Sequence, residues 1–278
     1  MKTCRRLLTA IACMAAAMAS TAQEDTPRTA RMVTTARMVA VGATDILDTY
    51  LSQEKYKGTE VRYMSHSLST KPGSNISRII IHQGMAAFAD NRSGNGGEME
   101  GMYNFQYGWL YNWSLCGSRL RVAAGATADA RIGFLYNTHG GNNPAQARLN
   151  INITPTASAA YSFRWGNIPL TASYELALPL AGIMFSPNYG QSYYEIFNRG
   201  NYDHNIVPTY LGNAPSMRNM LTVDIGLGNN ALRIGYLGDM QQAKPNSLKQ
   251  HTYTHALVLG IVRTIRMTKV RTGNFTQK

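Results

Sequence analysis

The segment YNFQYGWLYNWSL, residues 103–115, alternates between two kinds of side chain. Its odd-numbered positions hold six aromatic residues and Leu115, while its even-numbered positions are mostly small or polar. Because successive side chains of a β-strand point to opposite faces, this segment predicts a strand with one aromatic face. A soluble sandwich would bury that face against a second sheet, whereas a transmembrane barrel turns it toward lipid, with rings near both interfaces.

The same period of two recurs along the chain, for example where Ile132 and Phe134 alternate with Asp129 and Arg131. In the third segment we expect Ile79 and Ile81 on the lipid face. The number of segments with this alternation predicts ten strands, with eight or twelve as alternatives. The segments are 35–46, 57–70, 76–90, 103–115, 119–137, 147–165, 168–182, 217–227, 231–242 and 250–266.

Short and long connections between these segments alternate along the chain. Four are tight and rich in turn residues (71–75, 116–118, 166–167 and 228–230), and five are longer (47–56, 91–98, 138–146, 183–216 and 243–249). An outer-membrane barrel has short periplasmic turns, longer external loops and an even number of strands. The pattern therefore predicts an all-β fold, a transmembrane antiparallel up-and-down β-barrel, over residues 35–267, with both termini in the periplasm.

The ends of the chain indicate export. Lys2, Arg5 and Arg6 precede an apolar run and a small-residue cleavage site, which is typical of a signal peptide over residues 1–22. Removing these three cations lowers the formal net charge from +12 to +9. We interpret residues 23–34 as a periplasmic lead-in and 268–278 as a C-terminal periplasmic tail. Expected partners are outer-membrane lipid and lipopolysaccharide, the barrel-assembly machinery and a surface ligand, and not nucleic acid.

The polar strand faces supply charged residues of nearly balanced sign. A ten-stranded barrel is too narrow for a wide channel, so its interior is filled by side chains, and mutually paired charges are the expected filling. We predict a polar network in the lumen made of Glu60, Arg62, Asp129, Arg131, Glu175, Asp224, Arg233 and Asp239.

The connection 183–216 is far longer than its neighbours and carries too many aromatic rings for a solvated tether. Residues 192–198 could form a helical turn that places Tyr194 and Phe197 on one side. We predict that this loop folds over the barrel mouth and forms a recognition surface for a ligand or partner, centred on Tyr193, Tyr194, Glu195 and Phe197. A cap that only seals the lumen is the alternative.

The second hypothesis for function is a membrane-embedded hydrolase, a protease or lipase, with its site at the outer rim. Asp203 and His204 could act as a base and its orienting partner, and His66 beside Ser67 is a weaker signal of the same kind. The sequence holds no Gly-x-Ser-x-Gly, phosphate-loop or His-Glu-x-x-His motif. We therefore predict no catalytic residues, no cofactor and no metal site, and a binding or structural role over catalysis.

Four runs also resemble an uncharacterised family of exported proteins from Bacteroidetes, known as a domain of unknown function. The resemblance covers essentially the whole mature chain and implies a Gram-negative outer-membrane setting, without an activity or catalytic residues. The runs are 46–52 (ILDTYLS), Asn137 with 140–147 (GGNNPAQA), 184–187 (MFSP) with 190–197 (GQSYYEIF), and 251–255 (HTYTH).

Overall fold

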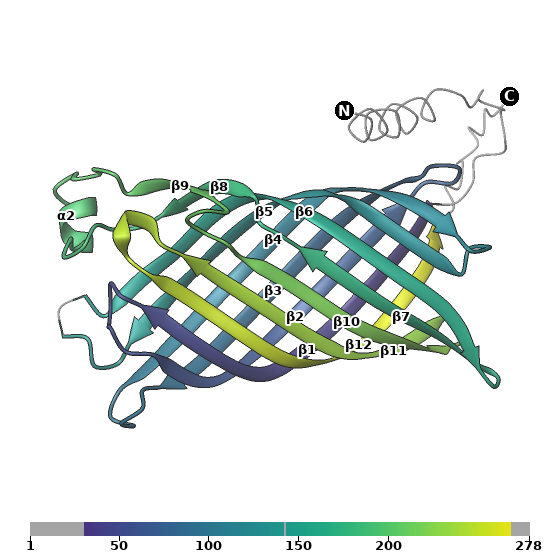
Figure 1. Ribbon diagram of the computed structural model, residues 1–278, viewed down its shortest axis with the longest axis horizontal. Helices are drawn as coiled ribbons and strands as arrows, with labels where there is room; N and C mark the ends of the chain where they lie inside the picture. Colours follow the sequence, from purple (N-terminus) through teal and green to yellow (C-terminus); the bar gives the residue numbers. More distant parts are fainter. Residues whose placement is uncertain (1–30, 142, 268–278) are drawn as a thin grey trace, which may run out of the picture. The chain divides into compact units, whose positions relative to one another are not determined.

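A computed structural model describes residues 31–141 and 143–267, and in it a closed antiparallel β-barrel is built from ten wall strands (Figure 1). The prediction of a ten-stranded barrel is confirmed. Two further short strands, β8 and β9, form a hairpin on the same sheet. The strands are β1 (Arg31–Asp48), β2 (Tyr56–Thr70), β3 (Ile76–Asp90), β4 (Gly97–Leu115), β5 (Leu120–Asn137), β6 (Ala145–Trp165), β7 (Ile168–Ala177), β8 (Ala181–Phe185), β9 (Ile206–Tyr210), β10 (Met217–Leu227), β11 (Asn230–Ala243) and β12 (Gln250–Met267).

The barrel closes between its first and last strands. The 18 residues of β1 pair with β12 from Arg31 opposite Met267 to Asp48 opposite Gln250. Residues 31–34 therefore belong to the wall and not to a lead-in. The predicted signal peptide, the rest of the lead-in and the C-terminal tail lie outside the described residues.

The wall has two different ends. Tight turns join β2 to β3, β4 to β5, β6 to β7 and β10 to β11 at the end where β1 begins, which we call the turn end. The longer connections lie at the opposite end, which we call the loop end (Figure 1). Among the described residues, no helix is long and apolar enough to cross a membrane.

The predicted loop 183–216 is partly wall. β8 continues β7 along β6, because the amides of Leu178 and Leu180 still bond to β6 across Pro179. β9 then returns antiparallel to β8, from Phe185 opposite Ile206 to Ala181 opposite Tyr210. The assignment of the whole segment as loop was therefore wrong for residues 183–185 and 206–210, which are strand.

The free edge of β9 is closed by a side chain. Asn213 Oδ1 accepts a hydrogen bond from the Tyr210 amide at 2.8 Å, and its Nδ2 donates to the Pro208 carbonyl at 2.8 Å. Pro208 has no amide hydrogen to offer. The amide of Lys244, which follows β11, donates to the Asn213 carbonyl at 2.7 Å and joins this edge to the next strand. A proline and a bonded side chain are devices by which proteins blunt an edge strand.

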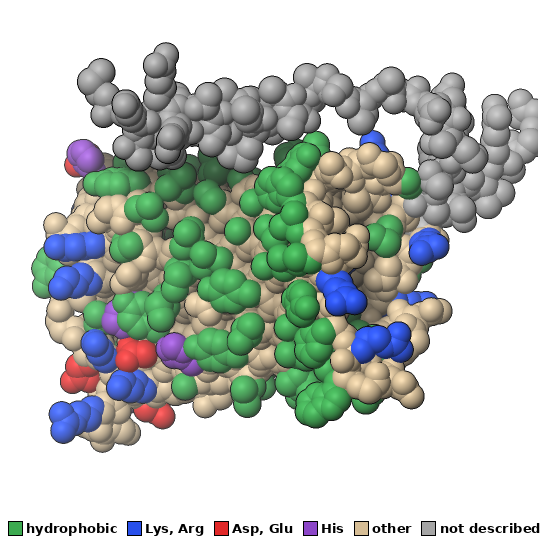
Figure 2. All heavy atoms as spheres, turned by 45° about the vertical axis from the view of Figure 1, so that its right-hand side comes forward, with side chains coloured by type: hydrophobic (Ala, Val, Ile, Leu, Met, Phe, Trp, Pro, Cys, Tyr) green, Lys and Arg blue, Asp and Glu red, His purple; other side chains and the backbone are tan. Residues whose placement is uncertain are grey.

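Side chains alternate between lumen and exterior along the wall. Val39 and Val41 of β1, Trp109 of β4 and Ile132 of β5 point outward, and hydrophobic side chains cover the middle of the face shown in Figure 2. In β3 the predicted faces were inverted, because Ile79 and Ile81 are buried in the lumen and Arg78 and His82 point outward. The two isoleucines pack with Leu68, Leu110 and Ala123 on the inner wall.

Candidate functional site

The middle of the lumen is filled by a charged cluster that we call the plug. Arg62 of β2 contacts Glu60 at 2.7 Å and reaches Asp239 of β11 at 2.5 Å, with all three side chains nearly buried. The Arg62 guanidinium also donates to Gln83 at 3.3 Å. The hydroxyl of Thr254 donates to Glu60.

Two further arginines tie distant strands of the plug together. Arg131 of β5 contacts Asp129 at 3.0 Å and donates to Gln241 of β11. Arg218 of β10 donates to Gln106 of β4 at 3.4 Å and to Glu175 of β7 at 3.4 Å. The bonds from Arg131 to Gln241 and from Arg218 to Gln106 join strands that are not neighbours in the sheet, so they cross the lumen and close its centre. A cavity of about 20 Å³ remains among Arg62, Arg131 and Arg218, and a larger one of about 380 Å³ lies beside Glu175, nearer the turn end.

The last pair lies nearer the turn end, where Arg233 donates to both oxygens of Asp224, at 2.6 and 2.8 Å. The structure thus places all eight residues of the predicted network inside the barrel, each with an oppositely charged partner. Sequence reasoning missed two members, Arg218 and His66. Arg218 lies on the polar face of β10 and was identifiable by its alternation with Leu221 and Val223.

The loop end of the lumen holds a second charged cluster, which we call the mouth. Asp48, Glu98 and Glu100 are buried there, and Arg148 of β6 lies 3.3 Å from Asp48. Thr252 donates to Glu100 at 2.8 Å, and Asn137 donates to Glu98 at 3.1 Å. Within the described residues, one oxygen of each of the three carboxylates and Nε of Arg148 have no hydrogen-bond partner.

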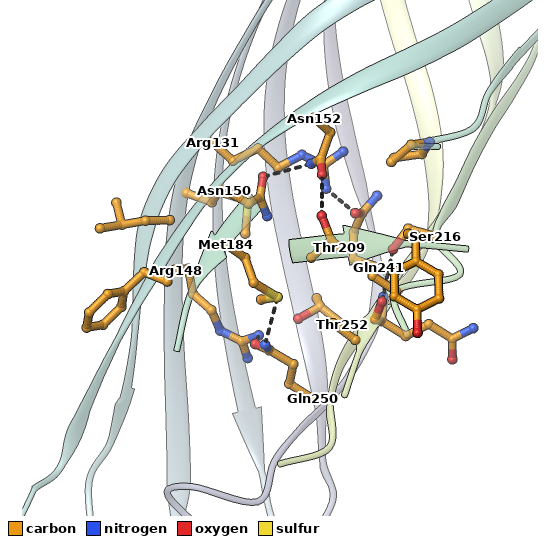
Figure 3. A pocket seen from close by; sticks show the side chains of 18 of the residues that line it. Arg131, Arg148, Asn150, Asn152, Met184, Thr209, Ser216, Gln241, Gln250 and Thr252 are labelled. Atoms are coloured by element: carbon orange, nitrogen blue, oxygen red, sulfur yellow. Dashed lines mark hydrogen bonds between the residues drawn. The ribbon is translucent and has the colours of Figure 1, made fainter. Parts of the chain in front are cut away.

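A hollow of about 60 Å³ opens beside the mouth, between the β8–β9 hairpin and strands β11 and β12. Figure 3 shows Arg131 and Arg148 facing it from one side, and Gln241, Gln250 and Thr252 from the other. Thr209 of β9 donates to Asn152 at 3.1 Å across its roof. The hollow is small and has both polar and apolar walls, with room for water-sized groups.

Above the mouth, residues 186–205 fold into a compact unit that we call the cap. Asn205 donates to Gln191 at 2.7 Å and to the Ser186 carbonyl at 3.2 Å, and Gln191 donates to the Asn201 carbonyl at 3.0 Å. Asn246, in the next connection, donates to the carbonyls of Ser186, Pro187 and His204. Side-chain amides thus satisfy backbone carbonyls of the cap, as strand pairing would in a sheet, and they hold a segment without regular structure in place.

The cap contains one helix, α2 (Tyr193–Phe197), capped by Ser192. The Ser192 hydroxyl accepts from the Glu195 amide at 3.2 Å, and the Glu195 carboxylate accepts from the Ser192 amide at 2.8 Å, which is a capping box. These bonds from Ser192 lower the pKa of Glu195 below its usual range. Glu195 therefore stabilises the N-terminus of α2 through its hydrogen bonds with Ser192.

Tyr193 anchors the cap to the barrel. Its hydroxyl donates to Gln146 at 3.0 Å and accepts from the Ala147 amide at 2.6 Å. The Tyr50 hydroxyl donates to the Gln191 carbonyl at 2.7 Å, and its ring meets Tyr193 edge-on. Burial raises the pKa of Tyr50 to about 12, and the neighbouring Tyr193 and Asp48 act in the same direction.

The remaining two predicted residues are exposed. Tyr194 is 58% exposed and lies 5.6 Å from the Arg199 guanidinium, and Phe197 is 60% exposed. Phe197 stacks on Tyr193 and Phe185, at 6.0 and 6.3 Å between ring centroids. We call Tyr194 and Phe197 the ring platform. The structure thus divides the predicted site, since Tyr193 and Glu195 hold the helix while Tyr194 and Phe197 face outward.

The residues of the hydrolase hypothesis do not bring a histidine base and a serine nucleophile together. His66 points into the lumen, 3.9 Å from Glu175, whereas the hydroxyl of Ser67 bonds to Thr35 on the other side of the wall. Asp203 and His204 contact each other at 2.5 Å, but both are largely exposed on the cap. Within the described residues, no three His, Cys, Asp or Glu side chains form a metal-binding group.

Comparison with known proteins gives a family and several similar solved structures. Residues 7–272 match the family model described as "Protein of unknown function (DUF3316)". No curated protein sequence matches the chain. Among solved structures, the outer-membrane protease OmpT from Escherichia coli aligns with a TM-score of 0.44 and 8% identity, over 88% of this chain and 100% of its own. The transport unit of the autotransporter AIDA-I from Escherichia coli aligns with a TM-score of 0.43 and 5% identity, over 91% and 94%.

Proposed function

Because the chain belongs to the DUF3316 family, whose function is unknown, we propose from its own geometry that it is an outer-membrane barrel that binds a cell-surface ligand through the ring platform. In this proposal the loop end faces the outside of the cell. The barrel then contacts outer-membrane lipid and lipopolysaccharide, and the barrel-assembly machinery inserts it.

The outer surface of the wall supports placement in a membrane. All three tryptophans, Trp109, Trp113 and Trp165, are exposed on the turn-end half of the wall. Phe88, Phe134 and other rings are exposed near the loop end, and valine, leucine and isoleucine side chains lie between. Rings flanking an apolar band on the outer surface are typical of transmembrane barrels.

The plug supports a role at the surface over passage of solutes. Arg62, Arg131 and Arg218 each bond across the lumen, and the cavity of about 20 Å³ among them has room only for single water molecules. Opening a path would separate buried ion pairs, which leaves charges uncompensated at a cost of about 3–5 kcal/mol each.

The observation that carries the proposal is the ring platform on a fixed helix. Aromatic rings in solvent contribute most to binding when they are held in one geometry, because little conformational entropy is then lost. The capping box and the Tyr193 anchor hold α2, yet Tyr194 and Phe197 lie in solvent. A cap that only seals the lumen needs Tyr193 and the buried Ile196, and it has no need of exposed rings.

The test uses the full chain in detergent micelles, labelled at the exposed Cys116 of the turn end. The probe is an array of surface polysaccharides and peptides, since flat rings stack on both apolar side chains and sugar faces. We expect the wild type to bind a subset of the array and Tyr194→Ser/Phe197→Ser to bind that subset at least tenfold more weakly, as for two interface rings worth about 1 kcal/mol each.

Tyr202→Ser is the matched control, because Tyr202 is 63% exposed in the same cap and has no ring partner among the described residues. It should bind as the wild type does. Equal binding by the double variant would leave the cap as a seal and contradict the proposal.

The orientation of the barrel is tested separately, by single cysteines in a Cys116→Ser background. Cysteines at Asn95 and Asn201 should react with an impermeant maleimide on intact cells, and cysteines at Ser74 and Asn229 should not.

A further inference from the structure

The two ends of the barrel differ in charge. At the turn end, Asp224 is the only acidic residue among those described, and it points inward to Arg233. On the face shown in Figure 2, acidic side chains gather at the loop end, while lysine and arginine alone mark the turn end. The basic residues of the turn end are Arg233, which pairs with Asp224, and Arg31, Arg37, Lys71, Arg78, Arg119, Arg121, Arg164, Arg263 and Arg266.

Two of these cations are close neighbours on the outer wall. Arg37 of β1 lies opposite Ile261 of β12, and Arg263 lies opposite Thr35, so the two arginines are diagonal neighbours on adjacent strands. Both are exposed on the outer face, and diagonal pairs are within reach of long side chains. Within the described residues, neither arginine forms an ion pair. Their two positive charges therefore repel each other without an acidic side chain of the described chain to compensate them.

A groove of about 750 Å³ begins between these arginines and runs over β11, β12 and β1 as far as Tyr63 of β2. Thr35 and Asn230 are polar groups beside the cations, while Val39, Leu232 and Leu259 form its apolar part. Asn230, the first residue of β11, lies opposite Arg263, so the cationic part is at the rim and the apolar part runs toward the middle of the wall. We call this groove the phosphate groove.

We propose that the phosphate groove binds an anionic phospholipid of the periplasmic leaflet, with its phosphate between Arg37 and Arg263 and an acyl chain along the apolar part. The inference rests on the proposed orientation of the barrel. Charge complementarity carries it, because an arginine facing lipid is unfavourable unless it reaches the head-group level, and a phosphate there would relieve the repulsion between the two guanidiniums. Guanidinium forks match phosphate oxygens in geometry.

The test measures lipid retention by native mass spectrometry of the full-length barrel, purified in detergent with equal amounts of phosphatidylglycerol and phosphatidylcholine. We expect the wild type to retain phosphatidylglycerol selectively, and Arg37→Gln/Arg263→Gln to retain on the order of tenfold less, since each cation contributes about 1 kcal/mol at an anionic surface. Arg121→Gln/Arg164→Gln is the matched control, because it removes the same charge from the same end and should retain lipid as the wild type does.

Two further arms separate the sources of phosphate. Glycerol phosphate has the same head group without acyl chains and should not compete, and purified lipid A should not bind at this site. Competition by glycerol phosphate, preference for lipid A, or equal loss in both double variants would overturn the proposal. If Arg37→Gln/Arg263→Gln fails to assemble, a photoactivatable phosphatidylglycerol is cross-linked to the wild type, and the cross-links must fall on β1, β11, β12 or Tyr63 of β2. Heat-modifiable migration reports barrel assembly separately, so failure of the groove is distinguishable from failure of the membrane placement.

Discussion

The plug and the mouth are two buried charged clusters in one lumen, and they are built differently. In the plug, Glu60 and Asp239 share Arg62, and Asp129 contacts Arg131. In the mouth, Arg148 contacts Asp48 but forms no ion pair with Glu98 or Glu100 within the described chain, and each carboxylate leaves one oxygen without a hydrogen bond. Both are equally removed from solvent, so the difference lies in charge balance. Balanced charge fills the barrel, whereas the surplus of negative charge lies directly below the cap.

The largest expected effect comes from breaking the plug. Arg62→Met should lower the free energy of unfolding by about 3–5 kcal/mol, because Glu60 and Asp239 are then buried without a cation. Urea titration followed by heat-modifiable migration measures it. Lys57→Met is the control, since Lys57 is 76% exposed and lies 3.9 Å from Asp45, and it should change stability by less than about 1 kcal/mol. Equal effects of the two variants would show that the plug does not stabilise the barrel.

A smaller effect of opposite sign sharpens the comparison. Glu100→Gln removes a buried charge whose Oε1 has no partner, so the same urea titration should show stability unchanged or raised by about 1 kcal/mol. Glu60→Gln removes an equally buried charge that contacts Arg62, and it should destabilise the barrel by about 2 kcal/mol. Destabilisation of both variants to the same extent would mean that the mouth is as well balanced as the plug.

The smallest effect is the response of the cap to alkali. The pKa of Tyr50 is raised from 10.0 to about 12, so its contribution to cap stability is complete below pH 10 and is lost as the pH rises through about 12. The difference in tyrosinate absorbance between wild type and Tyr50→Phe should titrate with a midpoint near pH 12. A midpoint near pH 10 would contradict the burial of Tyr50 beside Tyr193 and Asp48.

The wall was predictable because most strands have one apolar and one polar face. β3 was the exception, since Ile79 and Ile81 pack on apolar inner-wall neighbours while Arg78 points outward. Alternation alone cannot tell which face is the lumen when the lumen itself has apolar patches. β9 was missed because its five residues include Pro208, and its pairing with β8 is fixed by tertiary contacts.

The mouth was not predictable for a related reason. Glu98 and Glu100 precede the aromatic ladder in a glycine-rich stretch that resembles a loop, yet β4 begins at Gly97. Asp48 and Arg148 lie at strand ends, where period-two patterns fade, and only the closed barrel brings them to 3.3 Å. Plug residues such as Arg62, Asp129 and Arg131, by contrast, lie in the middle of strands, where alternation assigns each side chain to a face.

The pairing of β1 with β12 has a consequence for how the barrel assembles. Arg31 contacts Met267 at the far end of the chain, and this ladder runs the length of both strands. Until the last strand is made, β1 and β11 each present an open edge, so a partly synthesised chain cannot form a sealed cylinder at any stage. Contacts this distant in sequence slow spontaneous folding. A truncation within β12 therefore removes closure itself, and it leaves two complementary edges free to pair with another chain.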